Sequence, residues 1–169
     1  MKFRHVNSYA ASPAEVHAML AAPEFREEVC TYQRALEHSV DIVSDDRTTT
    51  VVITQSQSMD GAPAAARKLV GSSVQIVQRE VWQGGAGDTS GLDADFAMEI
   101  PGKPGHLKGQ ITLVDKGDGT CDEVFTGEVK VNVPLVGGKL EGFIADILTR
   151  ALTREGRVGV TWLEQHQGA

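Results

Sequence analysis

The chain has 169 residues, of which 41% are hydrophobic and 23% charged, and its formal net charge is −7. These values predict one globular domain, residues 1–169, with a sizeable core. An acidic chain with scattered basic residues is repelled by phosphate backbones, so we expect no nucleic-acid partner. No stretch approaches the roughly 18 apolar residues of a membrane span, and Met1–His5 opens no apolar signal segment. The sequence therefore predicts a cytoplasmic protein without integral membrane association.

The N-terminal part predicts one strand and two short helices. Residues 2–11 alternate like a strand, and Ser12–Glu15 is typical of a helix start. In that segment serine can cap the helix, proline suits its first position, and glutamate can close a capping box. Pro23 interrupts the first helix, and a second short helix is expected from there to about Tyr32.

Apolar alternation and β-branched residues predict six further strands joined by short turns. The clearest is 92–100, whose apolar residues alternate with aspartate and glutamate. Asp60–Pro63 is expected to be a loop, followed by one or two helical turns over 64–69, and the glycine-rich run 84–88 a flexible hairpin tip. The six expected strands are 34–44, 48–56, 74–83, 92–100, 107–115 and 121–133.

After Pro134–Gly138 the apolar period changes from 2 to 3.6, which predicts a long helix to about Gln165. Nearly 30 residues at 1.5 Å each would span about 40–45 Å. Gly156 and Gly159 either permit close approach to the sheet or mark a frayed end. We expect the helix to turn Phe143, Ile147 and Ala151 toward the sheet, and to turn toward water Lys139, Asp146, Arg150 and Arg154.

This order of elements resembles the START-like (SRPBCC) superfamily, which includes lipid-transfer domains, plant pathogenesis-related allergens and bacterial polyketide cyclases. The segments Phe3–Val16 and Pro134–Asp146 resemble those of an uncharacterised, mainly actinobacterial branch. The resemblance implies an α+β helix-grip fold: a curved antiparallel sheet of about seven strands around the long C-terminal helix, with two short helices after the first strand. It also implies a cavity between sheet and helix, but no known catalytic residue.

A sheet this curved cannot press its whole concave face onto one helix, so we expect a cavity that can hold an apolar ligand. The alternative is that side chains fill this space completely. The way in is expected near the N-terminal end of the long helix, with Asp60–Pro63 and Pro101–Gly105 as gates. The expected lining is Val52, Ile76, Leu92, Phe96, Met98, Ile111 and Phe125 from strands, and Phe143, Ile147 and Ala151 from the helix.

Three polar residues are candidates for the cavity. His38 shares a strand face with apolar residues, where a hydrogen-bonded packing role is also open. Glu80 either lies on an apolar face, where its pKa would rise, or reaches solvent at a strand end. The hydroxyl of Tyr32 either points into the cavity mouth or is the wet tip of a packing residue. Nothing in their spacing joins them, so we expect no catalytic set.

The sequence contains no motif for metal, disulfide, phosphate or dinucleotide chemistry. Cys30 and Cys121 lie far apart, the histidines have no metal spacing, and phosphate or dinucleotide loops are missing, so we expect no metal or cofactor. The sequence thus favours binding of a small hydrophobic molecule, such as a lipid, fatty acid or polyketide-like compound, by a non-enzyme. A cyclase or dehydratase using the same cavity, and a protein-interaction module without ligand, stay open. The ligand and the oligomeric state are not specified.

Overall fold

The computed structural model describes residues 1–84 and 92–167. Within them, seven strands form an antiparallel sheet in the order β1-β7-β6-β5-β4-β3-β2. The strands are β1 (Lys2–Tyr9), β2 (Glu37–Ser44), β3 (Thr48–Ser58), β4 (Ser73–Gln83), β5 (Asp93–Glu99), β6 (Gly105–Asp115) and β7 (Cys121–Val131). The helices are α1 (Pro13–Leu20), α2 (Pro23–Tyr32), α3 (Ala64–Val70) and α4 (Gly137–His166). The predicted α+β helix-grip architecture is confirmed.

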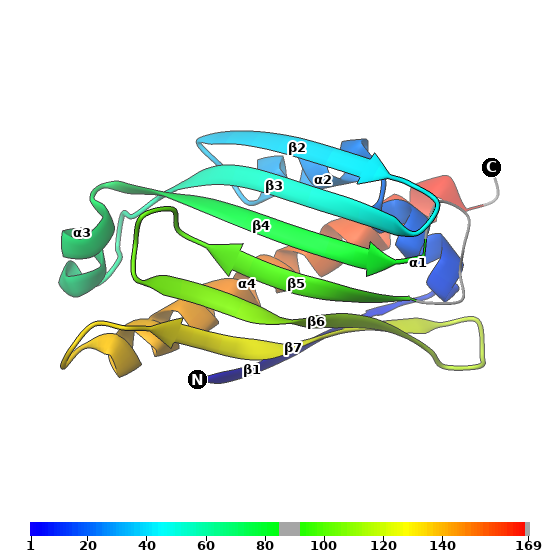
Figure 1. Cartoon of the computed structure of the whole chain (residues 1–169). Coiled ribbons are helices and arrows are strands. Elements are labelled where there is room, and N and C mark those ends of the chain that lie inside the picture. The colour runs from blue at the N-terminus through cyan, green and yellow to red at the C-terminus, as the bar shows by residue number, and fades with distance from the viewer. Residues whose placement is uncertain (85–91, 168–169) are drawn as a thin grey trace.

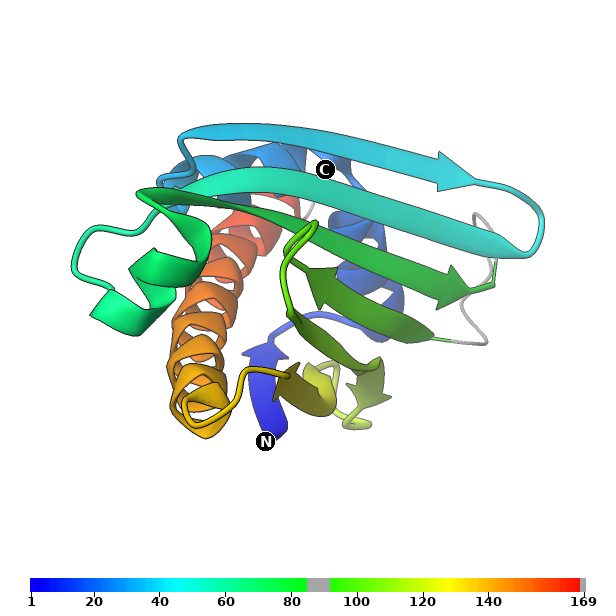
Figure 2. The same ribbon diagram turned by 60° about the vertical axis from the view of Figure 1, so that its left-hand side comes forward.

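The helices α1, α2 and α4 lie on one side of the sheet (Figure 1). The second view shows α4 running along the concave side, with α3 beside its N-terminal half (Figure 2). None of the described helices is long and apolar enough to cross a membrane. The hairpin tip expected at 84–88 lies, except for its first residue, outside the described residues.

Local signals explain the first helices. The Ser12 hydroxyl accepts a hydrogen bond from the Glu15 amide at 3.2 Å, as the expected cap requires. Arg34 has a φ of 59°, a left-handed conformation that ends the turn after α2. The next strand therefore begins at Glu37, three residues later than the alternation suggested.

The core has two parts. The larger part lies under α1, α2 and the C-terminal half of α4, and contains Trp82, Phe96 and Phe125. The smaller part joins α3 to the start of α4, and contains Ala66 and Leu140. Large aromatic side chains fill the first part, because none of these three is more than 2% exposed.

The C-terminal half of α4 approaches the sheet closely through glycines. A Cβ on Gly156 would lie 2.6 Å from Asn7 Oδ1, and one on Gly159 would lie 2.7 Å from Tyr9 Cε1. Any side chain there would push the helix away from β1. The close-approach interpretation of these glycines is confirmed, and the helix stays continuous over 30 residues.

Candidate functional site

A cavity of about 580 Å³ lies between the N-terminal half of α4, α3 and one end of the sheet. Its apolar wall contains side chains that are only half-buried, although they face the interior. This combination means that they border empty space rather than a packed core. The apolar wall is formed by Met59, Leu69, Val70, Val74, Ile76, Met98, Ile100, Leu107, Val131, Leu140, Phe143, Ile144, Ile147, Leu148 and Ala151.

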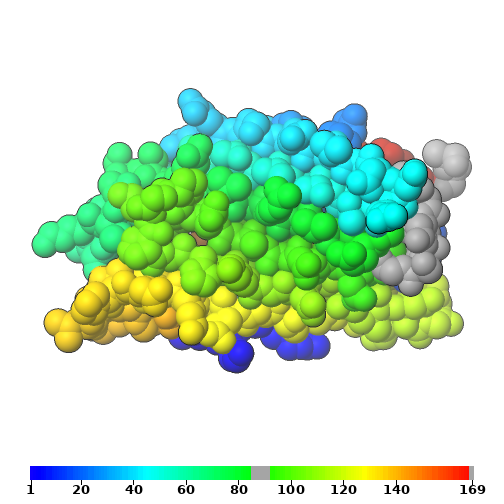
Figure 3. Space-filling view, in the orientation of Figure 1, coloured from blue at the N-terminus to red at the C-terminus, as the bar shows by residue number. Residues whose placement is uncertain are grey.

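Loops at this end of the molecule also border the cavity. They contribute Asp60–Ala62, which follows β3, together with Lys103 from the turn before β6 and Gly105, the first residue of β6. These are parts of the two segments expected to act as gates. Side chains close most of the outer face of the sheet (Figure 3). The loops beside α3 and α4 therefore offer a more open route than the sheet itself.

The structure divides the expected lining into three groups. Five residues border the cavity: Ile76, Met98, Phe143, Ile147 and Ala151. Phe96, Ile111 and Phe125 are fully packed in the larger core, and Leu92 packs against that core. These four lie on the expected face, but at the end of the sheet where aromatic side chains fill the space.

Val52 differs from its expected place. It pairs with Asp41 and Arg79 on the neighbouring strands, whereas Val51 and Ile53 are the buried residues of β3. Because successive side chains point to opposite faces of a strand, Val52 lies on the outer face. This corrects its assignment to the lining.

The three polar candidates lie apart, and none borders the cavity. Tyr32, at the end of α2, is 47% exposed. His38 lies on the edge strand β2 and contacts the carboxylate of Glu27. Glu80 is 1% exposed and paired with Arg26, so the reading in which it reaches solvent at a strand end is wrong.

Part of the polar wall of the cavity consists of three glutamines, which we call the amide wall: Gln33, Gln55 and Gln57. Gln57 Nε2 donates to Gln55 Oε1 at 3.0 Å, and Gln55 Nε2 donates to Gln33 Oε1 at 3.4 Å. Gln33 Nε2 in turn donates to the Ala151 carbonyl at 3.0 Å. The chain of amides ties β3 and α2 to α4, and each amide group keeps further hydrogen-bonding capacity.

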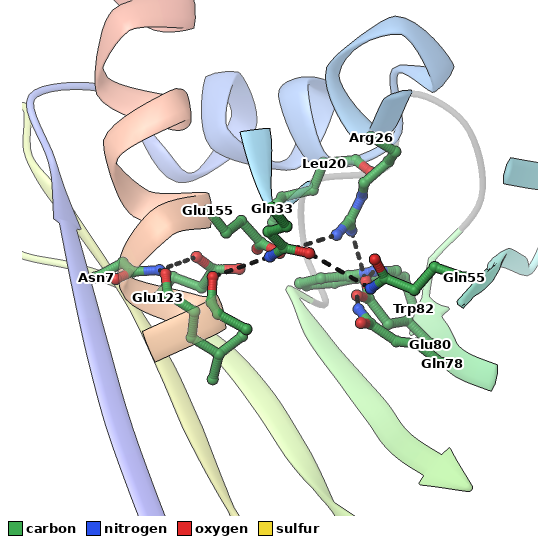
Figure 4. Close-up of polar contacts among 12 residues, drawn as sticks. Asn7, Leu20, Arg26, Gln33, Gln55, Gln78, Glu80, Trp82, Glu123 and Glu155 are labelled. Carbon is green, nitrogen blue, oxygen red and sulfur yellow. Dashed lines mark hydrogen bonds and ion pairs between the residues drawn. The ribbon is translucent and has the colours of Figure 1, made fainter. Parts of the chain in front are cut away.

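Behind this wall lies a buried group of charged side chains, the Arg26 cluster: Arg26, Glu80, Glu123 and Glu155 (Figure 4). Arg26 Nη2 donates to Glu80 Oε2 at 2.7 Å, and its Nη1 lies 3.7 Å from Glu155 Oε2. Glu123 accepts from the Tyr9 hydroxyl at 3.0 Å. The four side chains come from α2, β4, β7 and α4, so the cluster joins helices to sheet.

Burial and mutual repulsion shift the proton affinities of this cluster. Burial, and then the charge of Glu155, raise the pKa of Glu123 well above its ordinary value. Burial raises the pKa of Glu155 to about 7 against the attraction of Arg26. Burial would lower the pKa of Arg26, but Glu80 and then Glu155 raise it. With three carboxyl groups around one cation, the cluster favours a proton on Glu123 or Glu155 near neutral pH.

The sequence contained partial signals for this cluster. Glu155 interrupts the apolar stripe of α4 between Leu152 and Val158, and Glu123 shares the inward face of β7 with Phe125. A carboxylate on such a face has to be paired or neutral. Arg26 had no such signal, because three glutamates, Glu24, Glu27 and Glu28, lie beside it in the sequence and the whole segment looks solvated.

Neither metal nor thiol chemistry is evident in the described residues. They contain no group of three or more histidine, cysteine or acidic residues placed to hold a metal ion. Cys30 and Cys121 are buried free thiols, and burial raises the pKa of each to about 11. A thiol with such a pKa is a poor nucleophile at neutral pH.

Solved structures with this fold are similar over nearly the whole chain. The Zhui aromatase/cyclase from Streptomyces sp. R1128 has a TM-score of 0.67 at 10% identity, covering 100% of this chain and 96% of that one. A Thalictrum flavum norcoclaurine synthase point mutant, in complex with a transition-state analogue, has a TM-score of 0.60 at 15% identity, covering 99% and 96%. A START superfamily protein from Mycobacterium smegmatis has a TM-score of 0.57 at 10% identity, covering 96% and 98%.

These likenesses confirm the START-like fold. The identities are too low to transfer an activity, because proteins of one fold carry many functions. No curated protein matches the sequence significantly. One family model, described as protein of unknown function DUF2505, matches residues 4–163, and its extent shows that the chain belongs to the DUF2505 family.

Proposed function

We propose that this protein binds a small, largely apolar molecule in the cavity between the sheet and α4, as a carrier or sensor. The observation that carries the proposal is the cavity itself, which has a volume of about 580 Å³ and a mostly apolar wall. Sites for small molecules are typically apolar hollows of about 300–1,000 Å³ with a few polar groups. The amide wall supplies such groups.

The expected affinity follows from the apolar surface that a ligand can bury. A ligand with about 300 Å² of apolar surface gains roughly 7 kcal/mol at 25 cal/mol per Å². Lost rotational and translational freedom takes back up to about half of this gain, which leaves roughly 3.5–7 kcal/mol. The Kd is therefore expected in the micromolar to millimolar range, with selectivity set by the polar groups.

The similar structures support the use of this fold around small molecules. They include an aromatase/cyclase and a synthase whose structure contains a transition-state analogue. For this chain the binding function is favoured over an enzyme of that type, because the Arg26 cluster does not border the cavity. The titratable groups that do border it, Asp60, Glu99 and His106, form no hydrogen-bonded acid–base pair with one another in the described residues. A general acid or base has to reach the reacting atoms directly or through one water.

Fluorescence of 1-N-phenylnaphthylamine, a neutral apolar probe, tests the proposal. We expect a saturable rise in its emission with the purified protein. Ala151→Phe places a large side chain in the cavity and should weaken probe binding at least tenfold. Thr161→Phe adds the same side chain at an exposed position of the same helix, away from the cavity, and should leave binding within twofold.

Native mass spectrometry of freshly purified protein provides an independent measurement, because a bound molecule adds mass. Lack of probe binding, together with no added mass and no stabilisation by any apolar compound in a thermal-shift screen, would overturn the proposal. The hypothesis that the protein is an interaction module without a ligand would then be favoured.

A further inference from the structure

Two arginines, Arg150 and Arg154, border the cavity at the C-terminal end of its helical wall. They lie one turn apart, and their positions continue the stripe that carries Ile147 and Ala151. Both are exposed, yet both contribute to the cavity wall. The cavity face of α4 is therefore apolar toward its N-terminus and cationic where it ends.

Neither arginine has a carboxylate within 4 Å in the part of the chain that the structure describes. Asp146 precedes Arg150 by one turn but does not form that ion pair. The two acidic residues of the cavity wall, Asp60 and Glu99, belong to the loop after β3 and to the end of β5.

The amide wall lies at the same end. Gln33 and Gln55 face each other in Figure 4, and Gln33 is bonded to the carbonyl of Ala151, between the two arginines in sequence. The two arginines and the amide donors thus lie close together at one end of the cavity. The other end is lined by apolar side chains of α3 and of the start of α4, with the charged side chains Asp60, Glu99 and Lys103 and the imidazole of His106 at its loops.

We propose that Arg150 and Arg154 bind the anionic oxygen group of an amphiphilic ligand, a carboxylate or a phosphate monoester, whose apolar part occupies the cavity. This inference rests on the proposed function and specifies its ligand class. Guanidinium groups donate paired hydrogen bonds that match carboxylate and phosphate oxygens. With a neutral apolar ligand, the guanidinium N–H groups of both arginines would donate hydrogen bonds only to water.

The expected effect is moderate, because both side chains are exposed and solvent screens their charge. Replacing both arginines with glutamine should weaken binding of an anionic amphiphile about tenfold. A neutral ligand of the same chain length should lose less than twofold. Raising the salt concentration should likewise weaken only the anionic ligands.

Displacement of 1-N-phenylnaphthylamine by dodecanoate, dodecyl phosphate and 1-dodecanol provides the test. The variant Arg150→Gln/Arg154→Gln is compared with Lys139→Gln/Arg157→Gln. The second variant removes the same charge from exposed positions of α4 that do not border the cavity. We expect the first variant to lose affinity for the two anions but not for the alcohol, and the second to behave like the wild type. The anion with the larger loss identifies the headgroup.

The outcomes separate the two proposals. If the probe binds, but dodecanoate and dodecyl phosphate bind no better than dodecanol, the arginine assignment is wrong and the cavity function stands. The same holds if both double variants lose affinity equally, since net charge alone would then explain the effect. If the wild type binds neither the probe nor any amphiphile, the proposed function itself fails.

Discussion

Removal of Arg26 is the sharpest test of the buried charge cluster. In Arg26→Met, an apolar side chain of similar length replaces the cation that faces Glu80 and Glu155. The guanidinium is 1% exposed, and it also donates from Nε to the Leu20 carbonyl at 2.7 Å. Methionine can fill much of the volume, but it leaves carboxyl groups buried without their partner.

The magnitude follows from these contacts. Removing one partner of a buried, hydrogen-bonded ion pair costs about 3–5 kcal/mol, a large share of the roughly 5–15 kcal/mol that stabilises a domain. For a chain of this size, this corresponds to a fall in Tm of about 6–20 °C. Protonation can neutralise the stranded carboxyl groups, so the loss should be smaller at pH 5 than at pH 8.

Urea unfolding followed by circular dichroism at both pH values measures this cost. The double variant Arg26→Met/Glu80→Gln removes the charge nearest to the lost cation and should recover part of the stability. Lys2→Met, which breaks the exposed ion pair with Glu128, serves as a control and should cost less than about 1 kcal/mol. A cost below 1 kcal/mol for Arg26→Met at both pH values would refute the reasoning.

Two further predictions concern the cluster and the cavity. Because the native pKa of Glu155 is raised from 4.5 to about 7, the native state keeps a proton that the unfolded chain releases, and stability should fall as pH rises between these values, by up to about 1.4 kcal/mol per unit. Glu155→Gln should remove this component of the pH dependence. The pKa of His17 is lowered by burial and then by Arg26, so His17 acts in the opposite direction in both the wild type and the variant. If the free energy of unfolding depends on pH in the same way in both proteins, the raised pKa is not that of Glu155. Phe143→Ala, at the cavity, should lower the free energy of unfolding in urea by about 1–2 kcal/mol. Phe125→Ala, in the packed core, should lower it by about 3–5 kcal/mol. Equal losses would mean that side chains fill the cavity.

Alternation predicted which strand faces point inward wherever the pattern had a clear period. Phe96 and Met98 show this, since both lie on the inner face of β5. Val52 shows where it fails, because β3 contains the run Thr48–Thr54, in which β-branched residues suit either face. Its face was settled only by pairing with β2 and β4.

The Arg26 cluster could not be predicted as a unit from local sequence. Arg26 lies in a charged helix segment, and its burial depends on Glu80, Glu123 and Glu155, which are distant in the chain. The division of the inner face into a packed part and a cavity is also non-local. Ile111 and Ile76 have the same chemistry and both lie on the inner face, yet one is in the core and the other borders the cavity.

The geometry of α4 accounts for this division. A helix of 30 residues is a rod of about 45 Å, and a rod cannot follow a curved sheet along its whole length. Gly156 and Gly159 bring its C-terminal half against β1. Through Glu155, the Arg26 cluster also joins that half to α2 and β4. The N-terminal half keeps its contact with the β7 edge, where Glu141 accepts a hydrogen bond from the Val131 amide at 3.0 Å, but the cavity separates it from β3, β4 and β5, and α3 encloses the space that remains. Stability and ligand binding are thus expected to depend on different halves of one helix, so Ala151→Phe can block the cavity while the contacts of Arg26 stay intact.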